Sequence, residues 1–321
     1  MKLSIIIPQY KEGEKVIFPL LASIDNQMMI DFNDIEVLVL NDGSNIILSD
    51  EFLNQFVNIT PQYICLKKNV GLGMCRQAGL EHATGDYVMF CDADDRFFMN
   101  TALSLYFQTI AKYNPDFLSS RWYEELRKDG KSILVKHEAD KTWTHTKMYR
   151  RQFLIDNDIK HHPQLRVHED SYFTGLAYEL AETTRHIQAE TYVWCWNDNS
   201  ITRSNKSNFF VEEMRTFIFS ISELCKELER RGKTENLPSI SAGFLLHIYF
   251  SLYDPRFDFP QYMELKNQCV EDVREFYRLF KTYYDKFSKE EFAELYLLKK
   301  ERFKTTVETG KFKTFIDNLC R

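Results

Sequence analysis

The chain has 321 residues, with 41 Lys and Arg against 47 Asp and Glu, so its formal net charge is −6. With 44% hydrophobic and 27% charged residues, the composition is that of an ordinary globular protein and excludes a disordered or collagen-like chain. The acidic balance disfavours duplex nucleic acid as the main partner, because phosphate binding needs a positive surface.

The length predicts one catalytic-sized domain with an addition. Seven scattered cysteines without a Cys-x-x-Cys pair indicate neither a disulfide framework nor a structural zinc site. The opening residues contain no signal peptide, and the longest apolar runs are much shorter than the ~20 residues that cross a bilayer. We therefore expect a cytoplasmic protein without a transmembrane segment, for which peripheral contact with the inner face of the membrane stays open.

Four unbroken apolar runs lie in the first 100 residues, at 3–7, 35–40, 63–66 and 87–91. Such runs are typical of strands that are buried on both faces of a parallel sheet. Apolar residues at helical spacing predict helices between them, at 16–27 and 72–83. The order of elements predicts an α/β sheet of the kind that binds nucleotides.

The pattern becomes mixed after residue 100. The predicted elements are a helix at 101–113, strands at 117–122 and 132–136 around a turn at 128–130, helices at 147–157 and 170–181, and a strand at 191–196. Beyond residue 204, two apolar stripes at helical spacing predict helices that pack on one another. We expect a boundary at the polar stretch 204–208, between a domain at 1–204 and a helical domain at 205–321.

The strongest chemical feature is the segment YVMFCDADD at 87–95, an apolar strand that ends in Asp92, Asp94 and Asp95. In a doubly wound sheet, ligands bind beyond the carboxyl ends of the strands. Crowded carboxylates repel one another, so an ionised cluster calls for a cation, and Mn²⁺ or Mg²⁺ suits carboxylate and phosphate oxygens. The alternative is that Asp94 or Asp95 caps a helix or fills a turn.

Three further blocks precede this segment in order: LSIIIPQYKE at 3–12, EVLVLNDGS at 36–44 and KNVGLGMCRQAG at 68–79. Together the four blocks resemble the nucleotide-sugar half of the family 2 glycosyltransferases of GT-A fold. The resemblance is close over about the first 100 residues and extends thinly to about 204. It implies a Rossmann-like, mostly parallel sheet flanked by helices, with residues 1–100 binding the nucleotide sugar and 101–204 facing the acceptor.

The resemblance also implies a donor site. Its positions are Pro8, Tyr10, Glu12, Asp42, Asn69, Arg76, Asp92, Ala93 and Asp94. By this likeness Pro8, Tyr10 and Glu12 follow the first strand and form a wall of the nucleoside pocket. Asp42 accepts the imide N–H of a uracil, although an Asp-Gly turn is an equal alternative. Asp92 contacts the ribose or a metal-bound water, and Asp94 ligates the Mn²⁺ or Mg²⁺ ion that bridges the diphosphate.

Sugar transfer with inversion needs a base, because the attacking hydroxyl loses a proton. The segment His168-Glu169-Asp170 resembles the family's Glu-Asp pair at the start of the acceptor-side helix, where the second acid is the base, so we expect Asp170 in that role. Glu169 would face the acceptor or diphosphate. The alternative is that both acids stabilise a helix N-terminus.

Two stretches carry weaker signals. WCWNDNSITRS at 194–204 resembles the family's aromatic strand and loop, so Trp196, Ser200 and Thr202 would contact the diphosphate or acceptor. The alternative is a buried tryptophan and a solvent loop. His161 and His162 are adjacent on an expected loop, and we expect them on the surface rather than on a metal.

The resemblance predicts an inverting glycosyltransferase with a UDP-sugar as the expected donor. A glycan, teichoic-acid-like polymer, lipid-linked sugar or protein remains open as the acceptor. The Gln-x-x-Arg-Trp motif of processive synthases is absent from the sequence, so one sugar per encounter is expected. The C-terminal helices would hold the acceptor or pair subunits. A catalytically degenerate domain that binds nucleotide or glycan is the alternative, since donor binding is expected in both cases.

Overall fold

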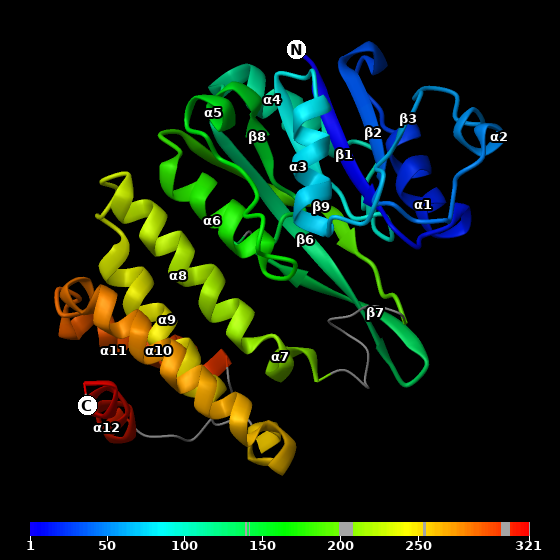
Figure 1. Ribbon diagram of the computed structural model, residues 1–321. Helices are drawn as coiled ribbons and strands as arrows, with labels where there is room; N and C mark the ends of the chain where they lie inside the picture. The colour runs from blue at the N-terminus through cyan, green and yellow to red at the C-terminus, as the bar shows by residue number, and fades with distance from the viewer. Residues whose placement is uncertain (139, 141, 199–207, 253–254, 303–308, 321) are drawn as a thin grey trace. The chain divides into compact units, whose positions relative to one another are not determined.

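The structure is a computed structural model that describes residues 1–138, 140, 142–198, 208–252, 255–302 and 309–320. The chain forms two compact units, Met1–Ser200 and Ile201–Arg321. The first unit is a mixed α/β structure and the second is helical (Figure 1).

One sheet organises the described part of the first unit. Its strands are β1 (Leu3–Gln9), β2 (Ile35–Asn41), β3 (Gln62–Cys65), β4 (Tyr87–Phe90), β5 (Arg96–Phe97), β6 (Phe117–Lys128), β7 (Lys131–His137), β8 (Met148–Arg150) and β9 (Thr184–Trp194). The strand order is β3-β2-β1-β4-β8-β6-β9-β5, with β7 paired to β6 off this path. The first four strands are parallel, β6 is parallel to β9, and β8 runs antiparallel to its two neighbours.

Helices cover this sheet. They are α1 (Glu14–Asp25), α2 (Asp50–Leu53), α3 (Leu72–His82), α4 (Ala102–Tyr113), α5 (Arg151–Asp156) and α6 (Glu169–Leu180), with a 3₁₀ turn at Phe32–Asp34. The strand–helix order predicted for the first 100 residues is confirmed, and α2 is an additional short helix that the sequence pattern did not indicate.

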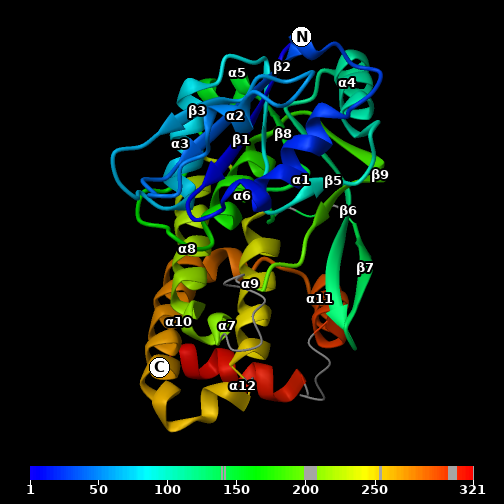
Figure 2. The ribbon, with the colours of Figure 1, turned by 90° about the vertical axis from the view of Figure 1, so that its right-hand side faces the viewer.

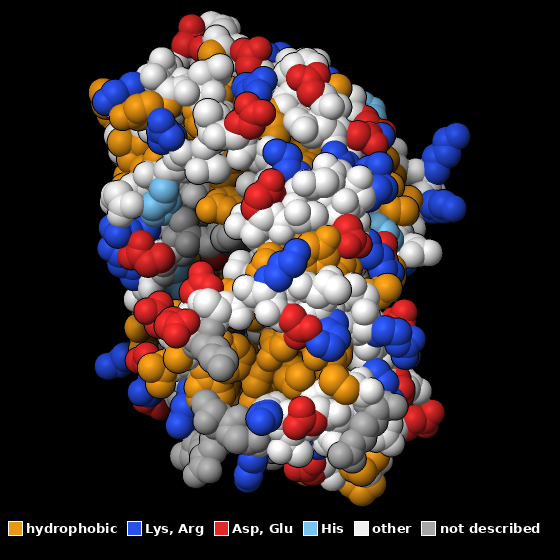
Figure 3. Space-filling view, turned by 90° about the vertical axis from the view of Figure 1, so that its left-hand side faces the viewer, with side chains coloured by type: hydrophobic (Ala, Val, Ile, Leu, Met, Phe, Trp, Pro, Cys, Tyr) orange, Lys and Arg blue, Asp and Glu red, His pale blue; other side chains and the backbone are white. Residues whose placement is uncertain are grey.

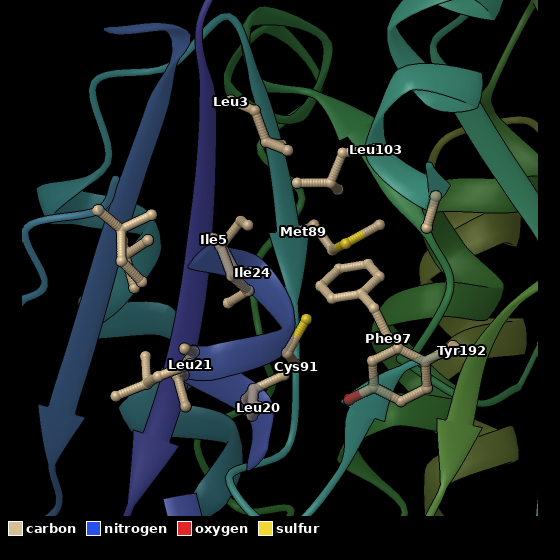
Figure 4. Close-up of a cluster of buried hydrophobic side chains, with 14 of the residues drawn as sticks. Leu3, Ile5, Leu20, Leu21, Ile24, Met89, Cys91, Phe97, Leu103 and Tyr192 are labelled. Atoms are coloured by element: carbon tan, nitrogen blue, oxygen red, sulfur yellow. The ribbon is translucent and has the colours of Figure 1, made fainter. Parts of the chain in front are cut away.

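The central strand β1 is apolar at five of its seven positions, and both of its faces are buried. Successive side chains point to opposite faces of a strand. Leu3 and Ile5 lie in a core cluster that includes Ile24 of α1 and Met89 of β4 (Figure 4). Ile6 faces α3, where a Cβ atom on Gly79 would lie only 2.3 Å from the Ile6 Cγ2 atom. This contact allows α3 to pack tightly against β1.

Pro8 lies inside β1, where it pairs with Leu40, so its expected place after the first strand is wrong. The Ile6 carbonyl accepts a hydrogen bond from the Cys91 N–H on the β4 side. The backbone nitrogen of Pro8, two residues later, points to the same side as the Ile6 carbonyl, where the pairing between β1 and β4 has ended. A proline fits there because no strand hydrogen bond requires its missing N–H.

The sequence predicts one helix at 147–157, and this prediction is wrong. Met148 and Tyr149 begin a short strand, β8, that pairs with both β4 and β6, and the helix α5 starts only at Arg151. Two apolar residues, Met148 and Tyr149, do not distinguish a buried strand from a helix. The pairing with two strands from distant parts of the chain determines the outcome.

The strands β6 and β7 form a long hairpin that extends from the sheet (Figure 2). Asp129 and Gly130 at its tip have φ values of 51° and 73°. A two-residue turn with both φ values positive matches the twist of the flanking strands. The turn predicted at 128–130 is therefore confirmed.

The second unit consists of helices in its described part. They are α7 (Phe209–Glu212), α8 (Met214–Arg230), α9 (Leu237–Ser251), α10 (Met263–Tyr284), α11 (Lys289–Arg302) and α12 (Thr309–Leu319), with 3₁₀ turns at Pro255–Asp258 and Pro260–Tyr262. Phe244 of α9 contacts Phe217 of α8 and Phe276 of α10, with ring centroids 6.0 and 4.4 Å apart. In the ranges that the structure covers, no helix combines the length and apolar character needed to span a membrane.

Candidate active site

The parallel strands β1, β2 and β4 bring three predicted segments to one edge of the sheet. Tyr10 and Glu12 follow β1, Asp42 follows β2, and Asp92 and Asp94 follow β4. Carboxyl ends of parallel strands lie at the same edge, which is where ligands bind in such sheets. The face of the molecule in Figure 3 carries Lys and Arg mixed with Asp and Glu rather than a continuous basic surface.

Arg76 joins two acidic groups in this region. It lies on α3 with 3% of its side chain exposed, and its guanidinium is 2.5 Å from Asp92 Oδ1 and 2.7 Å from Glu169 Oε1. Burial by itself lowers the pKa of Arg76, but the carboxylates of Asp92, Glu169 and Asp170 raise it above the ordinary value. The guanidinium is therefore a permanent cation that connects the end of β4 to the start of α6.

Gly73 permits this connection. A Cβ atom at Gly73 would lie 2.8 Å from Glu169 Cγ, closer than side chains approach one another. The first turn of α3 therefore needs a residue without a side chain where α6 begins. His168, the residue before α6, has a φ of 57°, which turns the chain into the helix.

Asp170 follows Glu169 on α6 and is the carboxyl that we expect to act as the base. Burial and repulsion by Glu169 raise its pKa to about 7, while Arg76 opposes the shift. Its Oδ1 atom accepts a hydrogen bond of 2.8 Å from the Ser171 N–H. A carboxyl with this pKa both holds and releases a proton near neutral pH, as a general base must.

The three acids that follow β4 have different environments. Asp95 is wholly buried and accepts a hydrogen bond from the Cys195 N–H at 2.8 Å, so it has a structural role. Asp94 accepts a hydrogen bond of 2.8 Å from Asn197 Nδ2. Burial raises the pKa of Asp94, and repulsion from Asp92 and Glu12 raises it further. The hydrogen bond from Asn197 acts in the opposite direction and lowers it. A cation beside Asp94 would relieve this repulsion.

The acids fit a metal site that relies on few protein ligands. Within the described ranges, no three His, Cys, Asp or Glu side chains gather closely enough to enclose a metal ion. Arg76 already pairs with Asp92, so Asp94 would be the principal carboxylate to hold such an ion. Mg²⁺ and Mn²⁺ accept one or two carboxylates and complete their shells with water and phosphate oxygens. The donor set is therefore compatible with an ion that is bound together with a diphosphate.

Asp42 and Asn69 meet on the nucleoside side. Asp42 is 4% exposed, and its carboxylate accepts hydrogen bonds from Asn69 Nδ2 at 2.9 Å and from the N–H groups of Val70 and Gly71 at 2.7 and 3.0 Å. Asp42 therefore holds the loop that leads into α3. The sequence did not indicate these contacts, because it suggested for Asp42 either a bond to the uracil or a local Asp-Gly turn.

The first wall of the expected nucleoside pocket has one ordered carboxylate. Glu12 Oε2 accepts hydrogen bonds from the N–H groups of Tyr10 and Lys11, at 2.7 and 3.1 Å. The Tyr10 side chain is 40% exposed, as a ring that stacks on a ligand would be, whereas Pro8 is buried. Ala93 is also buried, 4% exposed, between the two acids of the cluster.

Trp196 is held by its backbone and its ring. Its N–H donates to Glu125 Oε2 at 3.1 Å, and its Nε1–H donates to Asp198 Oδ1 at 2.7 Å. Ser200 and Thr202 lie outside the described residues.

His161 corrects a second expectation, because it is buried rather than on the surface. Only 2% of it is exposed, and its ring stacks on Phe173 with centroids 4.2 Å apart. Burial and the nearby Arg76 charge hold its pKa well below the ordinary value, so the imidazole is neutral. Lys147 is likewise buried, with none of its side chain exposed, and no sequence motif marked it.

Residues 4–165 match the family described as glycosyl transferase family 2. The chain belongs to this family. Among its relatives, the uncharacterised glycosyltransferase YibD of Escherichia coli K12 is 26% identical over 254 residues, which are 71% of each chain. TarS of Staphylococcus aureus MW2, a poly(ribitol-phosphate) β-N-acetylglucosaminyltransferase, is 27% identical over 303 residues, which cover 86% of this chain and 50% of TarS. The present chain thus spans about half the length of that family 2 relative.

Solved family 2 structures show the same fold. The crystal structure of S. aureus TarS residues 1–349 aligns with a TM-score of 0.65 at 20% identity, covering 96% of this chain and 93% of the other. The complex of the same fragment with UDP aligns with a TM-score of 0.62 at 21% identity, over the same shares. The predicted GT-A fold, with its mostly parallel sheet and C-terminal helices, is confirmed by this likeness.

Proposed function

We propose that this family 2 glycosyltransferase transfers one sugar from a UDP-sugar to an acceptor hydroxyl with inversion. The observation that carries the proposal is the placement of Asp170. Its carboxyl, with a pKa of about 7, follows Glu169, which Arg76 joins to Asp92 of the acid cluster. A proton acceptor and a diphosphate-binding edge therefore belong to one connected set of side chains.

Each step has a group to perform it. Asp42 and the loop that it holds would bind the uracil, and the Tyr10 ring would cover it. Asp94, with Asp92 nearby, would hold Mn²⁺ or Mg²⁺, which when bound supplies positive charge for the departing diphosphate. The acceptor oxygen forms a bond to the anomeric carbon as the bond to the diphosphate breaks. The hydroxyl proton passes to Asp170, and the diphosphate leaves with the bonding electrons.

A polymer with repeating polyol phosphates is the acceptor that we test first. TarS and a Bacillus spizizenii relative, 27% identical over 57% of this chain, are named as poly(ribitol-phosphate) glycosyltransferases. The wider class of glycan, lipid-linked and protein acceptors stays within the proposal, since another relative is named as a cholesterol galactosyltransferase. The helices of the second unit would hold the acceptor or pair subunits, and the enzyme would work in the cytoplasm.

A panel of UDP-sugars with Mn²⁺, in which released UDP is measured with and without poly(ribitol phosphate), tests this function. We expect one donor to release UDP slowly in water and faster with an acceptor, and EDTA to abolish both. Asp170→Asn should abolish transfer, while Asp156→Asn, an exposed helical aspartate, should not. UDP binding without turnover of any donor would instead favour a degenerate domain that only binds.

A further inference from the structure

Lys147 is a buried ammonium that directly precedes β8. None of its side chain is exposed, and Nζ lies 3.3 Å from Asp140 Oδ2. The other oxygen of Asp140 accepts hydrogen bonds from the N–H groups of Thr142 and Trp143. Among the described residues, no acceptor completes a hydrogen bond to Lys147 Nζ. Burying a charge in this way costs several kcal/mol unless nearby charges compensate, so the surroundings of Lys147 call for an explanation.

The register of β8 places Lys147 opposite the first turn of α6. Lys147 precedes β8 and shares a face with Tyr149, whose hydroxyl is 3.1 Å from Thr174 Oγ1 on α6. Thr174 is one helical turn after Asp170. A step of two residues on a strand covers about 6.6 Å and one helical turn covers about 5.4 Å. β8 runs antiparallel to β4, so Lys147 lies towards the end of β4, where Arg76 joins Asp92 to Glu169 at the start of α6. One step from the Tyr149–Thr174 contact towards that end therefore leads to Lys147 and Asp170.

Electrostatics agree with this placement. Burial lowers the pKa of Lys147, and attraction to Asp140 and then to Asp170 opposes the shift. Coulomb attraction is mutual, so Lys147 favours the ionised form of Asp170 as much as Asp170 favours the ammonium.

We propose that Lys147 is a positioning residue for the transfer step, whose ammonium, anchored by Asp140, stabilises the ionised form of Asp170. This inference rests on the proposed function of Asp170 as the base. Lys147 itself touches neither donor nor acceptor in the proposal. It sets the pH range in which the base is ready to accept a proton.

The other groups that face Asp170 do not provide the same control. Glu169 on α6 and Asp92 after β4 repel its negative charge, and Arg76 on α3 attracts it. Arg76 is already paired with two carboxylates, whereas Lys147 is paired with Asp140 alone among the described residues. The Tyr149 hydroxyl lies 3.1 Å from Thr174 Oγ1, and burial raises its pKa, so it stays neutral.

Two substitutions in this ion pair should move the titration of Asp170 in opposite directions. Lys147→Met keeps an unbranched side chain but removes the cation, so the midpoint should rise by about one pH unit. Asp140→Asn removes a nearby negative charge and leaves Lys147 uncompensated, so the midpoint should fall. Lys147→Arg retains the charge and should restore the wild-type midpoint.

The titration is read directly by NMR on protein labelled with ¹³C at the aspartate carboxyl, with the Asp170 signal assigned from its loss in Asp170→Asn. The pH profile of donor hydrolysis, in which water is the acceptor, provides the second measurement. Lys147→Met should shift the acidic limb of kcat upward, which lowers kcat about tenfold at pH 6, while the Kd for UDP is unchanged.

An Asp170 midpoint that stays at the wild-type value in Lys147→Met overturns the inference, as does a kcat lowered equally at every pH. If Lys147→Met does not fold, Asp140→Asn decides, because an unmoved or raised midpoint in that variant contradicts the inference. NMR needs no turnover. A shifted midpoint in a protein that is inactive towards every donor would therefore reject the proposed function while supporting the coupling between Lys147 and Asp170.

Discussion

Arg76 and Glu169, 93 residues apart in the chain, form a buried ion pair of 2.7 Å. The same guanidinium holds Asp92 at 2.5 Å. Through this one side chain, the strand end that carries the acid cluster is tied to the helix that carries the proposed base. In the proposed function, the pair would therefore link donor binding to proton transfer.

Arg76→Met should destabilise the protein by about 3–5 kcal/mol, because it leaves Glu169 buried without its cation and Asp92 without its partner. We expect a lower urea midpoint and a weaker affinity for UDP. Arg278→Met, which removes an exposed i,i+3 pair on α10, is the matched control and should cost less than about 1 kcal/mol. Equal urea midpoints for the two variants would show that the buried ion pairs of Arg76 contribute no more to stability than the exposed pair of Arg278.

Gly73→Ala should displace Glu169, since the new Cβ would lie 2.8 Å from its Cγ atom. We expect a loss of about 1–3 kcal/mol of stability and a fall in kcat. Gly243→Ala on α9 is the control, because its nearest neighbour is Leu295 Cδ2 at 3.8 Å. Alanine there should be neutral or stabilise the helix by up to about 1 kcal/mol. A Gly73→Ala enzyme with wild-type kcat would contradict the tight α3–α6 contact.

The rate of transfer should rise with pH through about 7 and then level off. Asp170 accepts a proton only when ionised, and its pKa is raised to about 7. Below that value the rate should fall tenfold for each pH unit. The measurement is kcat against pH at saturating donor. A rate that is constant between pH 5 and 8 would be inconsistent with Asp170 as the base.

Asp170→Asn should lower kcat by roughly 10² to 10⁴-fold, the usual contribution of a general base, with UDP affinity preserved. The same substitution should stabilise the protein at pH 8. The carboxyl has a pKa of about 7 when folded against a model value of 3.8, so wild-type stability falls as pH rises from about 4 to 7. We expect a gain of up to about 4 kcal/mol at pH 8 and little difference at pH 4. If wild type and Asp170→Asn had identical urea midpoints at pH 4 and also at pH 8, the pKa of Asp170 would not be raised.

The sequence predicts the strands that are buried on both faces, because apolar side chains predominate on both faces of each strand. The run Leu3 to Ile7 has a single polar residue, Ser4, and the carboxylates that follow Phe90 indicate a candidate site together with the three blocks that precede them. The role of Asp170 as the base comes only from the family resemblance. Without the resemblance, an acid at this position would indicate the start of a helix.

Local sequence patterns do not predict contacts between segments that are far apart in the chain. Nothing local marks Gly73 as the neighbour of Glu169, or separates buried Asp95 from Asp94 next to it. Met148 and Tyr149 form a strand only because two other strands accept them. Lys147 is hidden for the same reason, since its counter-charges come from Asp140 and α6.

Calorimetry of UDP binding tests the acid cluster that the whole account requires. In Mn²⁺ buffer, the wild-type protein should bind UDP at least tenfold more tightly than in EDTA, and Asp94→Asn should lose this difference. Asp156→Asn should keep it, which controls for the loss of one negative charge. If wild-type protein binds UDP equally well with and without the ion, and Asp94→Asn binds it as the wild type does, these acids do not hold a metal against the diphosphate.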